Sequence, residues 1–204
     1  MVIKAIIFDV GGVLIDFSEE KYISWLSNKL NIDYKKIDNA ILPLIDKMEM
    51  GRLKLEKAEK IFSKKLNIHP KSLMWVEGFS ENASPNVQVI KILEKLSKSY
   101  KIGVITNVSF SRYYESRKLV LNSLLSKGCV KTIISSCYFG VRKPNHKIYE
   151  EALKKLNVKA EETVFIDNQI ENVEGAAKLG IHALLYTTAK KLEKDLRSLD
   201  IKIN

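Results

Sequence analysis

The sequence of 204 residues contains only two cysteines and lacks a long apolar run. Cys129 and Cys137 are too few for a disulfide framework or a cysteine-based metal site. No apolar run approaches the roughly 18 residues that a membrane-spanning helix needs. The opening segment MVIKAIIFDV holds an apolar stretch too short for the core of a signal peptide, and no small-residue cleavage site follows it. We therefore expect a cytoplasmic protein that does not bind membranes.

Arginine is scarce as well, although the chain is basic. Lysine and arginine together number 34 against 24 acidic residues, a net charge of +10, and only five of the 34 are arginine. Lys and Glu are interspersed along helical stretches and no nucleic-acid motif is present, so we expect a solvated lysine-rich surface and no nucleic-acid partner. Residues 112–147 carry eight basic residues and one acid, a bias that favours the approach of an anionic substrate.

Five short apolar runs predict the strands of a parallel sheet. They do not alternate and are rich in Ile and Val, which is typical of strands covered on both faces. Helical patterns separate the later runs, and this alternation predicts an α/β fold with a Rossmann-like, doubly wound parallel sheet. The predicted strands are 3–9, 101–106, 131–135, 163–167 and 182–186, and the predicted helices are 86–98, 110–125, 146–156, 170–179 and 189–199.

The segment between the first two strands departs from this alternation, because it has helical patterns and no strand pattern. We expect an inserted all-helical cap subdomain over residues 16–84, and a core made of residues 1–15 and 85–204. Trp25, Trp75 and Phe79 are expected in the apolar core of the cap rather than as a substrate platform. The predicted cap helices are 19–30, 34–48, 55–66 and 71–79.

Polar residues follow the predicted strands at the points where the strands end. Asp9 and Asp167 end two of them, Thr106 ends a third, and Lys143 lies in the loop after a fourth. Ligands of open parallel sheets bind at this edge, so the four side chains are expected to converge there. Asp9 is suited to act as a carboxylate nucleophile. Lys143 would neutralise negative charge, while the Thr106 hydroxyl and nearby backbone N–H groups would hold substrate oxygens.

Four motifs in a fixed order carry a family resemblance. They are FDVGGVL (8–14), VITN (104–107), GVRKPNHKIY (140–149) and FIDNQIENVEGAAKLGI (165–181). With the helical insertion, they make the chain resemble the haloacid dehalogenase-like (HAD) superfamily over nearly its whole length. The cap segment EMGRLKLEKAEKIF (49–62) is similar to the phosphatase subgroup related to sugar-phosphate phosphatases and to the N-terminal domain of soluble epoxide hydrolases.

The resemblance implies a hydrolase, most directly a Mg²⁺-dependent phosphatase of a small phosphorylated metabolite that works through an aspartyl-phosphate. The catalytic residues would be Asp9 as nucleophile, Thr106 as phosphate-binding hydroxyl and Lys143 as charge stabiliser. Gly12 and Asn107, within the same motifs, are expected to bind substrate. The positions that would hold Mg²⁺ are Asp9, the Gly11 carbonyl, Asp167 and Asn168.

Two positions depart from the pattern of the family's phosphatases. Gly11 stands where these enzymes usually carry an Asp that protonates the leaving oxygen, so the proton would have to come from a cap residue such as Glu49 or from the substrate. Asn168 stands where an acidic metal ligand is common, and its neutral amide oxygen predicts weaker metal binding.

These departures leave two alternatives open. The first is a metal-independent 2-haloacid dehalogenase, although that branch of the family lacks acids at the fourth motif, where this chain has Asp167, and has an aromatic residue at the position of Gly11. The second is a catalytically weak relative that binds a phosphorylated ligand or a partner protein. Gly11 and Asn168 motivate this second alternative.

Overall fold

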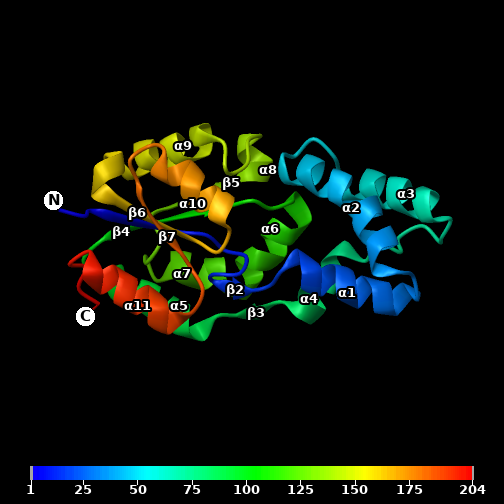
Figure 1. Cartoon of the computed structure of the whole chain (residues 1–204), viewed down its shortest axis with the longest axis horizontal. Coiled ribbons are helices and arrows are strands. Elements are labelled where there is room, and N and C mark those ends of the chain that lie inside the picture. Colours follow the sequence, from blue (N-terminus) through cyan, green and yellow to red (C-terminus); the bar gives the residue numbers. More distant parts are fainter. Residues whose placement is uncertain (1, 204) are drawn as a thin grey trace.

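The structure is a computed structural model, and it describes residues 2–203. Its centre is a sheet of five parallel strands in the order β5-β4-β1-β6-β7, which confirms the predicted α/β fold with a doubly wound parallel sheet (Figure 1). The strands are β1 (Ala5–Phe8), β4 (Lys101–Thr106), β5 (Thr132–Ser135), β6 (Thr163–Asp167) and β7 (His182–Leu185).

Helices cover both faces of the sheet because its apolar side chains point to both sides in turn. Ile6 and Phe8 of β1 belong to one apolar cluster, whereas Ala5 and Ile7 belong to a second cluster on the opposite face. Figure 1 shows α9 and α10 above the sheet and α5, α7 and α11 below it. These helices are α5 (Val87–Leu96), α7 (Asn122–Ser126), α9 (His146–Leu156), α10 (Ile170–Ala177) and α11 (Ala189–Ser198).

Four further helices gather beyond one end of the sheet (Figure 1). Their N-termini follow local sequence signals: the side chain of Ser18 accepts a hydrogen bond from the Lys21 N–H, and that of Asp33 accepts one from the Lys36 N–H. The boundaries of the predicted cap, residues 16–84, stay a prediction. The helices are α1 (Glu19–Leu30), α2 (Tyr34–Glu49), α3 (Leu55–Leu66) and α4 (Trp75–Asn82).

A two-stranded antiparallel ribbon joins the two ends of this insertion. It consists of β2 (Ile15–Asp16) and β3 (Ser84–Pro85), and it pairs Asp16 with Ser84. The sequence analysis did not predict it, because two residues are too few for a strand pattern. The chain therefore enters and leaves the four helices at one place.

The largest local difference from the prediction lies between β4 and α9. The single helix expected at 110–125 is a continuous series of α6 (Phe110–Ser116), a π-helical segment (Arg117–Leu121) and α7. A short helix, α8 (Ser136–Phe139), follows β5 and was not expected, and neither was the 3₁₀ turn at Ala160–Glu162. Such short elements contain too few residues for a helical period to emerge.

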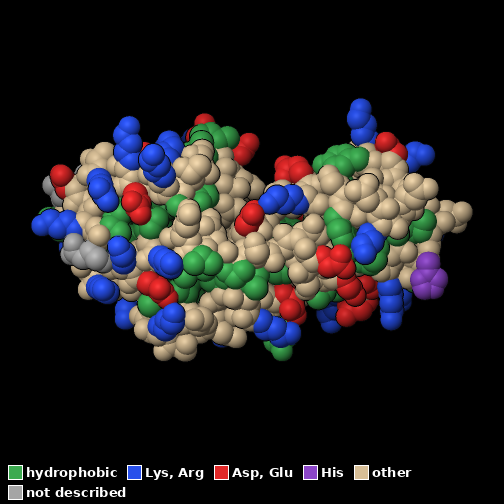
Figure 2. All heavy atoms as spheres, turned by 90° about the horizontal axis from the view of Figure 1, so that it is seen from below, with side chains coloured by type: hydrophobic (Ala, Val, Ile, Leu, Met, Phe, Trp, Pro, Cys, Tyr) green, Lys and Arg blue, Asp and Glu red, His purple; other side chains and the backbone are tan. Residues whose placement is uncertain are grey.

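The surface matches the expectation of a solvated lysine-rich protein. Figure 2 shows lysine and arginine side chains scattered over the visible face, with acidic side chains between them and one group of acidic side chains toward the right. Among the residues that the structure describes, no helix combines the length and apolar character needed to cross a bilayer.

Candidate active site

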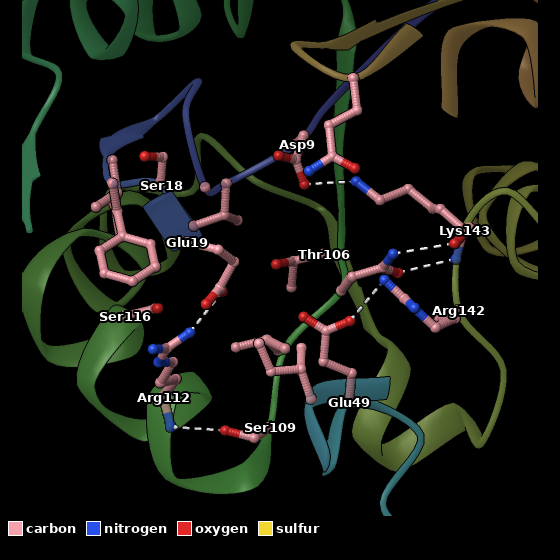
Figure 3. Close-up of a pocket in the computed structure, with 18 of the residues that line it drawn as sticks. Asp9, Ser18, Glu19, Glu49, Thr106, Ser109, Arg112, Ser116, Arg142 and Lys143 are labelled. Atoms are coloured by element: carbon pink, nitrogen blue, oxygen red, sulfur yellow. Dashed lines mark hydrogen bonds and ion pairs between the residues drawn. The ribbon is translucent and has the colours of Figure 1, made fainter. Parts of the chain in front are cut away.

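Three strand ends and one loop bring the predicted catalytic residues together. Asp9 follows β1, Thr106 ends β4 and Asp167 ends β6, and β1 lies between the other two strands in the sheet. Lys143 comes from the loop between α8 and α9 and reaches the same edge (Figure 3). All four side chains are buried. Their proximity follows from the strand order, because the carboxyl ends of adjacent parallel strands share one edge.

Lys143 is bound between the two carboxylates. Its Nζ donates to Asp9 Oδ1 at 2.5 Å and to Asp167 Oδ2 at 2.6 Å, and it lies 3.2 Å from the backbone oxygen of Ile105. Burial lowers the pKa of Lys143, but the carboxylates of Asp167 and Asp9 outweigh burial and raise the pKa above its ordinary value. The lysine is therefore a fixed positive charge at the strand ends.

The carboxylate of Asp9 faces opposing influences. Burial raises its pKa to about 7, while the Lys143 ammonium group opposes this rise and the Asp167 carboxylate adds to it. The side chain is 8% exposed. A second positive charge beside Asp9, such as a bound cation, would favour the ionised form that a nucleophile requires.

Asp167 lies against Lys143 rather than in the open part of the site. Its Oδ1 accepts hydrogen bonds from the Gln169 N–H at 2.8 Å and the Asn172 amide at 3.2 Å. Its Oδ2 accepts from Lys143 and from the same amide, and the side chain is fully buried. Both oxygens are thus occupied, which favours a role in holding Lys143. Its predicted metal ligation stays a prediction.

Asn107 and Gly12 were predicted to contact substrate, and the structure gives their polar groups other partners. The Asn107 amide donates to the Lys143 carbonyl at 3.0 Å and accepts from the Lys143 N–H at 2.8 Å, so it fixes the lysine backbone. The Gly12 N–H donates to the Ile15 carbonyl at 2.7 Å. Gly12 has φ +81°, and a Cβ there would collide with the side chain of Asn168. Their substrate contacts stay predictions.

The oxygen atoms available for a cation are mixed in charge. Lys143 binds Oδ1 of Asp9 and not Oδ2. Among the described residues, the Gly11 carbonyl accepts no backbone hydrogen bond. The side chain of Asn168 is exposed and lies next to Gly12. Within residues 2–203, no group of three or more His, Cys, Asp or Glu side chains is placed to hold a metal. A carboxylate, a carbonyl and an amide are nevertheless hard oxygen donors of the kind that Mg²⁺ accepts, with water completing its shell.

A cavity of about 430 Å³ opens from this edge toward the four inserted helices. Asp9, Thr106 and Lys143 line one part of it, and residues of α1, α2 and α4 line the other. Of the three aromatic residues predicted for the cap core, Trp75 and Phe79 are buried and Trp25 is partly buried, and Trp75 and Phe79 also face the cavity. The volume suits a small molecule.

Arg112 on α6 is a cavity residue that the sequence analysis did not single out. Its Nη1 donates to Glu19 Oε1 of α1 at 2.6 Å, and its guanidinium carbon lies 3.3 Å from the centre of the Trp75 ring. Ser109 adds a second link from α6 to α4, since its Oγ accepts a hydrogen bond from the Trp75 indole at 2.9 Å. Glu19 and Arg112 are 93 positions apart in the sequence, so no regular spacing could have indicated that they form a pair.

Glu49 lies in the same cavity, below Thr106 in Figure 3. Its Oε2 is 3.0 Å from Arg142, which also pairs with Asp46. Burial raises the pKa of Glu49 to about 7 although the Arg142 charge opposes the shift; Glu19 and Asp46 raise the pKa further and Arg112 lowers it. Glu49 therefore holds a proton over a range in which an ordinary glutamate is ionised.

Comparison with known proteins connects this geometry with one family. The model of the haloacid dehalogenase-like hydrolases matches residues 3–180. A crystal structure of a HAD family enzyme from Bacteroides thetaiotaomicron, described as a magnesium complex, superposes with a TM-score of 0.81 at 18% identity. The superposition covers 97% of this chain and 100% of that one. At this identity the likeness shows the fold.

Two curated relatives are phosphatases. A sesquiterpene phosphatase of Aspergillus oryzae is 28% identical over 56% of this chain and 57% of its own length. A glyceraldehyde 3-phosphate phosphatase of Methanothermobacter thermautotrophicus is 27% identical over 55% of this chain and 50% of its own length. The chain therefore spans about half the length of these relatives.

Proposed function

The chain belongs to the haloacid dehalogenase-like hydrolases, and we propose that it is a Mg²⁺-dependent phosphatase of small phosphate monoesters. The observation that carries the proposal is the Asp9–Lys143 pair, at 2.5 Å, beside Thr106 in one wall of the cavity. A buried carboxylate with a fixed ammonium group suits attack on a highly charged centre, because the lysine offsets the charge that accumulates there.

The proposed reaction has two displacement steps. One oxygen of Asp9 attacks phosphorus, and the bond between phosphorus and the leaving oxygen breaks as the aspartyl-phosphate forms. The leaving oxygen takes a proton and departs as an alcohol. Water then attacks the aspartyl-phosphate and gives a proton to the group that protonated the leaving oxygen. The bond between phosphorus and the Asp9 oxygen breaks, which releases inorganic phosphate and restores the Asp9 carboxylate. During both steps Lys143 stabilises negative charge, and the Thr106 hydroxyl donates to a phosphoryl oxygen.

For the cation we propose Mg²⁺ held by Asp9, the Gly11 carbonyl and Asn168, with Asp167 acting through Lys143 or through water. Their hard oxygen atoms support this assignment. Bound Mg²⁺ supplies positive charge for the phosphoryl oxygens. The related structure described as a magnesium complex is consistent with this choice.

For the proton that Gly11 cannot give, we propose Glu49 as donor. Its place in the cavity and its raised pKa, about 7, support this role, because a carboxyl group that is protonated near neutral pH can act as a general acid. We propose further that residues 16–84 form the cap that carries this group to the leaving oxygen.

Glu49→Gln is expected to affect substrates according to their leaving groups. For an alkyl phosphate, whose alkoxide needs a proton, kcat should fall by about 10²–10⁴-fold. For p-nitrophenyl phosphate, whose leaving group needs little protonation, the loss should be much smaller. In the unchanged protein at saturating Mg²⁺, which favours ionised Asp9, kcat for the alkyl phosphate should decline as pH rises through about 7, since Glu49 loses its proton there. Steady-state kinetics from pH 5 to 9 measure both effects.

Asp46→Asn is the matched control, because it removes another carboxylate that pairs with Arg142 and is itself exposed. It should keep the ratio of kcat between the two substrates, while the decline of kcat for the alkyl phosphate moves to lower pH, because Asp46 contributes to the raised pKa of Glu49. Equal losses for both substrates in Glu49→Gln would rule out the proposed proton donor.

Removal of divalent cations tests the proposed metal dependence. Phosphate release from p-nitrophenyl phosphate should stop with EDTA and return with excess Mg²⁺. Because Asn168 is neutral, we expect half-maximal activity at a higher Mg²⁺ concentration than in an Asn168→Asp variant. Chloride release from 2-chloropropionate that persists in EDTA would instead support a dehalogenase. Ligand-induced thermal stabilisation without any turnover would support a binding protein.

A further inference from the structure

Unpartnered buried polar atoms gather in the cavity wall away from Asp9. Among residues 2–203, six buried side-chain nitrogen or oxygen atoms lack a hydrogen-bond partner. Five of the six belong to four residues that line the one cavity: Glu19, Glu49, Arg112 and Arg142. Buried polar atoms are normally hydrogen-bonded, so this concentration calls for a partner that the protein itself does not provide.

Of the two pairs, Glu19 and Arg112 have more polar atoms without hydrogen-bond partners than Glu49 and Arg142 have. Glu49 and Arg142 partly satisfy each other through their ion pair at 3.0 Å. Glu19 and Arg112 share only the bond from Nη1 to Oε1, which leaves Glu19 Oε2 and both Nε and Nη2 of Arg112 without partners. The two residues thus hold one unpaired acceptor and two unpaired donors, and these three atoms have almost no exposed surface.

Arg112 is held rigidly in this position. Its guanidinium carbon lies 3.3 Å from the centre of the Trp75 ring and 4.7 Å from the centres of the Phe17 and Tyr22 rings. The residue is only 4% exposed. Contacts with the rings hold the group but cannot satisfy the in-plane N–H donors, which need oxygen acceptors.

The chemistry of the free atoms selects among possible leaving groups. A hydroxyl group is both donor and acceptor, so it can accept from Arg112 and donate to Glu19 Oε2 at the same time. A second anionic group would suit Arg112 but would be repelled by Glu19. An apolar group would leave every free atom unsatisfied, which is costly in a buried site.

The position of Glu19 and Arg112 relative to Asp9 fits a role in binding a hydroxyl group of the leaving group. Figure 3 shows Glu19 and Arg112 on one side of the cavity, Asp9 and Lys143 on the other, and Thr106 between them. A phosphate group at Asp9 and Thr106 would therefore direct the rest of the substrate toward Glu19 and Arg112.

We propose that Glu19 and Arg112 form a hydroxyl-binding subsite, and that the preferred substrates are phosphate monoesters of polyhydroxylated alcohols. The substrate class rests on the proposed phosphatase function, whereas binding by the subsite does not require turnover. Glu19 and Arg112 are thus specificity-determining residues for the part of the substrate that leaves.

Three phosphates with the same five-carbon chain test the proposal. They are ribitol 5-phosphate, pentyl phosphate and 5-phosphooxypentanoate, which differ in hydroxyl groups and in a second anionic group. With Mg²⁺ present, kcat/KM for the polyol ester should exceed that for either other ester by at least about tenfold, the effect of one hydrogen bond to a charged partner. Equal values, or a preference for the second anion, would overturn the proposal.

Variants assign the preference to particular atoms. Glu19→Gln replaces the charged acceptor with a neutral amide of the same shape, and the ratio of polyol to alkyl kcat/KM should fall toward 1. Glu81→Gln is the matched control, since Glu81 is an exposed cap glutamate outside the cavity, and its ratio should match that of the unchanged protein. A ratio that survives Glu19→Gln would exclude Glu19 as its source.

A binding measurement separates the subsite from the reaction. Calorimetric titration of an Asp9→Asn variant with ribitol 5-phosphate and pentyl phosphate should show at least about tenfold tighter binding of the polyol ester. This difference should disappear when Glu19→Gln is added. If Asp9→Asn binds the polyol ester more tightly but the unchanged protein releases phosphate from no ester, the subsite is upheld and the phosphatase function is refuted. Equal binding of the two esters would refute the subsite, whatever the turnover.

Discussion

Replacing Asp9 with Asn should reduce phosphate release from p-nitrophenyl phosphate by at least about 10⁴-fold, as expected when a covalent nucleophile is removed. The substitution changes one oxygen to an amide nitrogen, and the remaining oxygen can still accept the hydrogen bond from Lys143 that is 2.5 Å long in the structure. The fold should therefore persist, and the loss would lie in chemistry. Steady-state assays at saturating Mg²⁺ measure the effect.

A comparison with Asp9→Glu sharpens this experiment. Glutamate keeps the charge but moves the attacking oxygen by one methylene, so activity should stay far below that of the unchanged chain. Circular dichroism and thermal unfolding confirm that both variants are folded. Turnover by Asp9→Asn above about a tenth of the original value would exclude Asp9 as nucleophile.

Lys143→Met should have the second large effect, and this effect extends to stability. Lys143 is 1% exposed and lies between the Asp9 and Asp167 carboxylates, which are 8% and 0% exposed. Without the ammonium group, two carboxylates are left together in a buried site. Breaking a buried ion pair from one side costs about 3–5 kcal/mol, because the remaining charge is uncompensated. Urea unfolding in EDTA measures the change in unfolding free energy.

The double variant Asp9→Asn/Lys143→Met tests the electrostatic cause. It removes one of the two buried carboxylates that lack a neutralising charge. Its unfolding free energy should therefore exceed that of Lys143→Met alone by at least about 1 kcal/mol. If the double variant were less stable than Lys143→Met, packing of the lysine stem rather than charge would explain the loss. Phosphate release should be absent in both variants.

The sheet and the gathering of polar side chains at its edge were accessible from the sequence for a simple reason. Buried parallel strands need continuous apolar runs, and each of the five predicted runs contains the whole of an observed strand. The convergence of Asp9, Thr106, Lys143 and Asp167 then follows from strand ends sharing one edge. Local pattern and global geometry coincide here, so the sequence alone was sufficient.

The far wall of the cavity was not accessible in the same way. Glu19 and Arg112 belong to helices that are distant in sequence, and each resembles an ordinary charged surface residue of an amphipathic helix. Their contact depends on how α1 and α4 pack against α6, which no periodicity encodes. The contact of Asp167 with Lys143 was also hidden, because a strand-ending carboxylate does not reveal whether it faces a lysine or a metal, and the sequence analysis gave Asp167 as a metal-binding position.

The ribbon of β2 and β3 has a consequence for how such a protein can change over generations. Because Asp16 and Ser84 are directly paired, the ends of the intervening segment are adjacent whatever its length. Insertions, deletions or a wholesale exchange between these two points need not alter the spacing of the sheet, since a loop's closure cost grows slowly with its length. The strand-end edge that carries Asp9 and the part of the cavity wall that comes from α1, α2 and α4 can therefore evolve as separable parts of one gene.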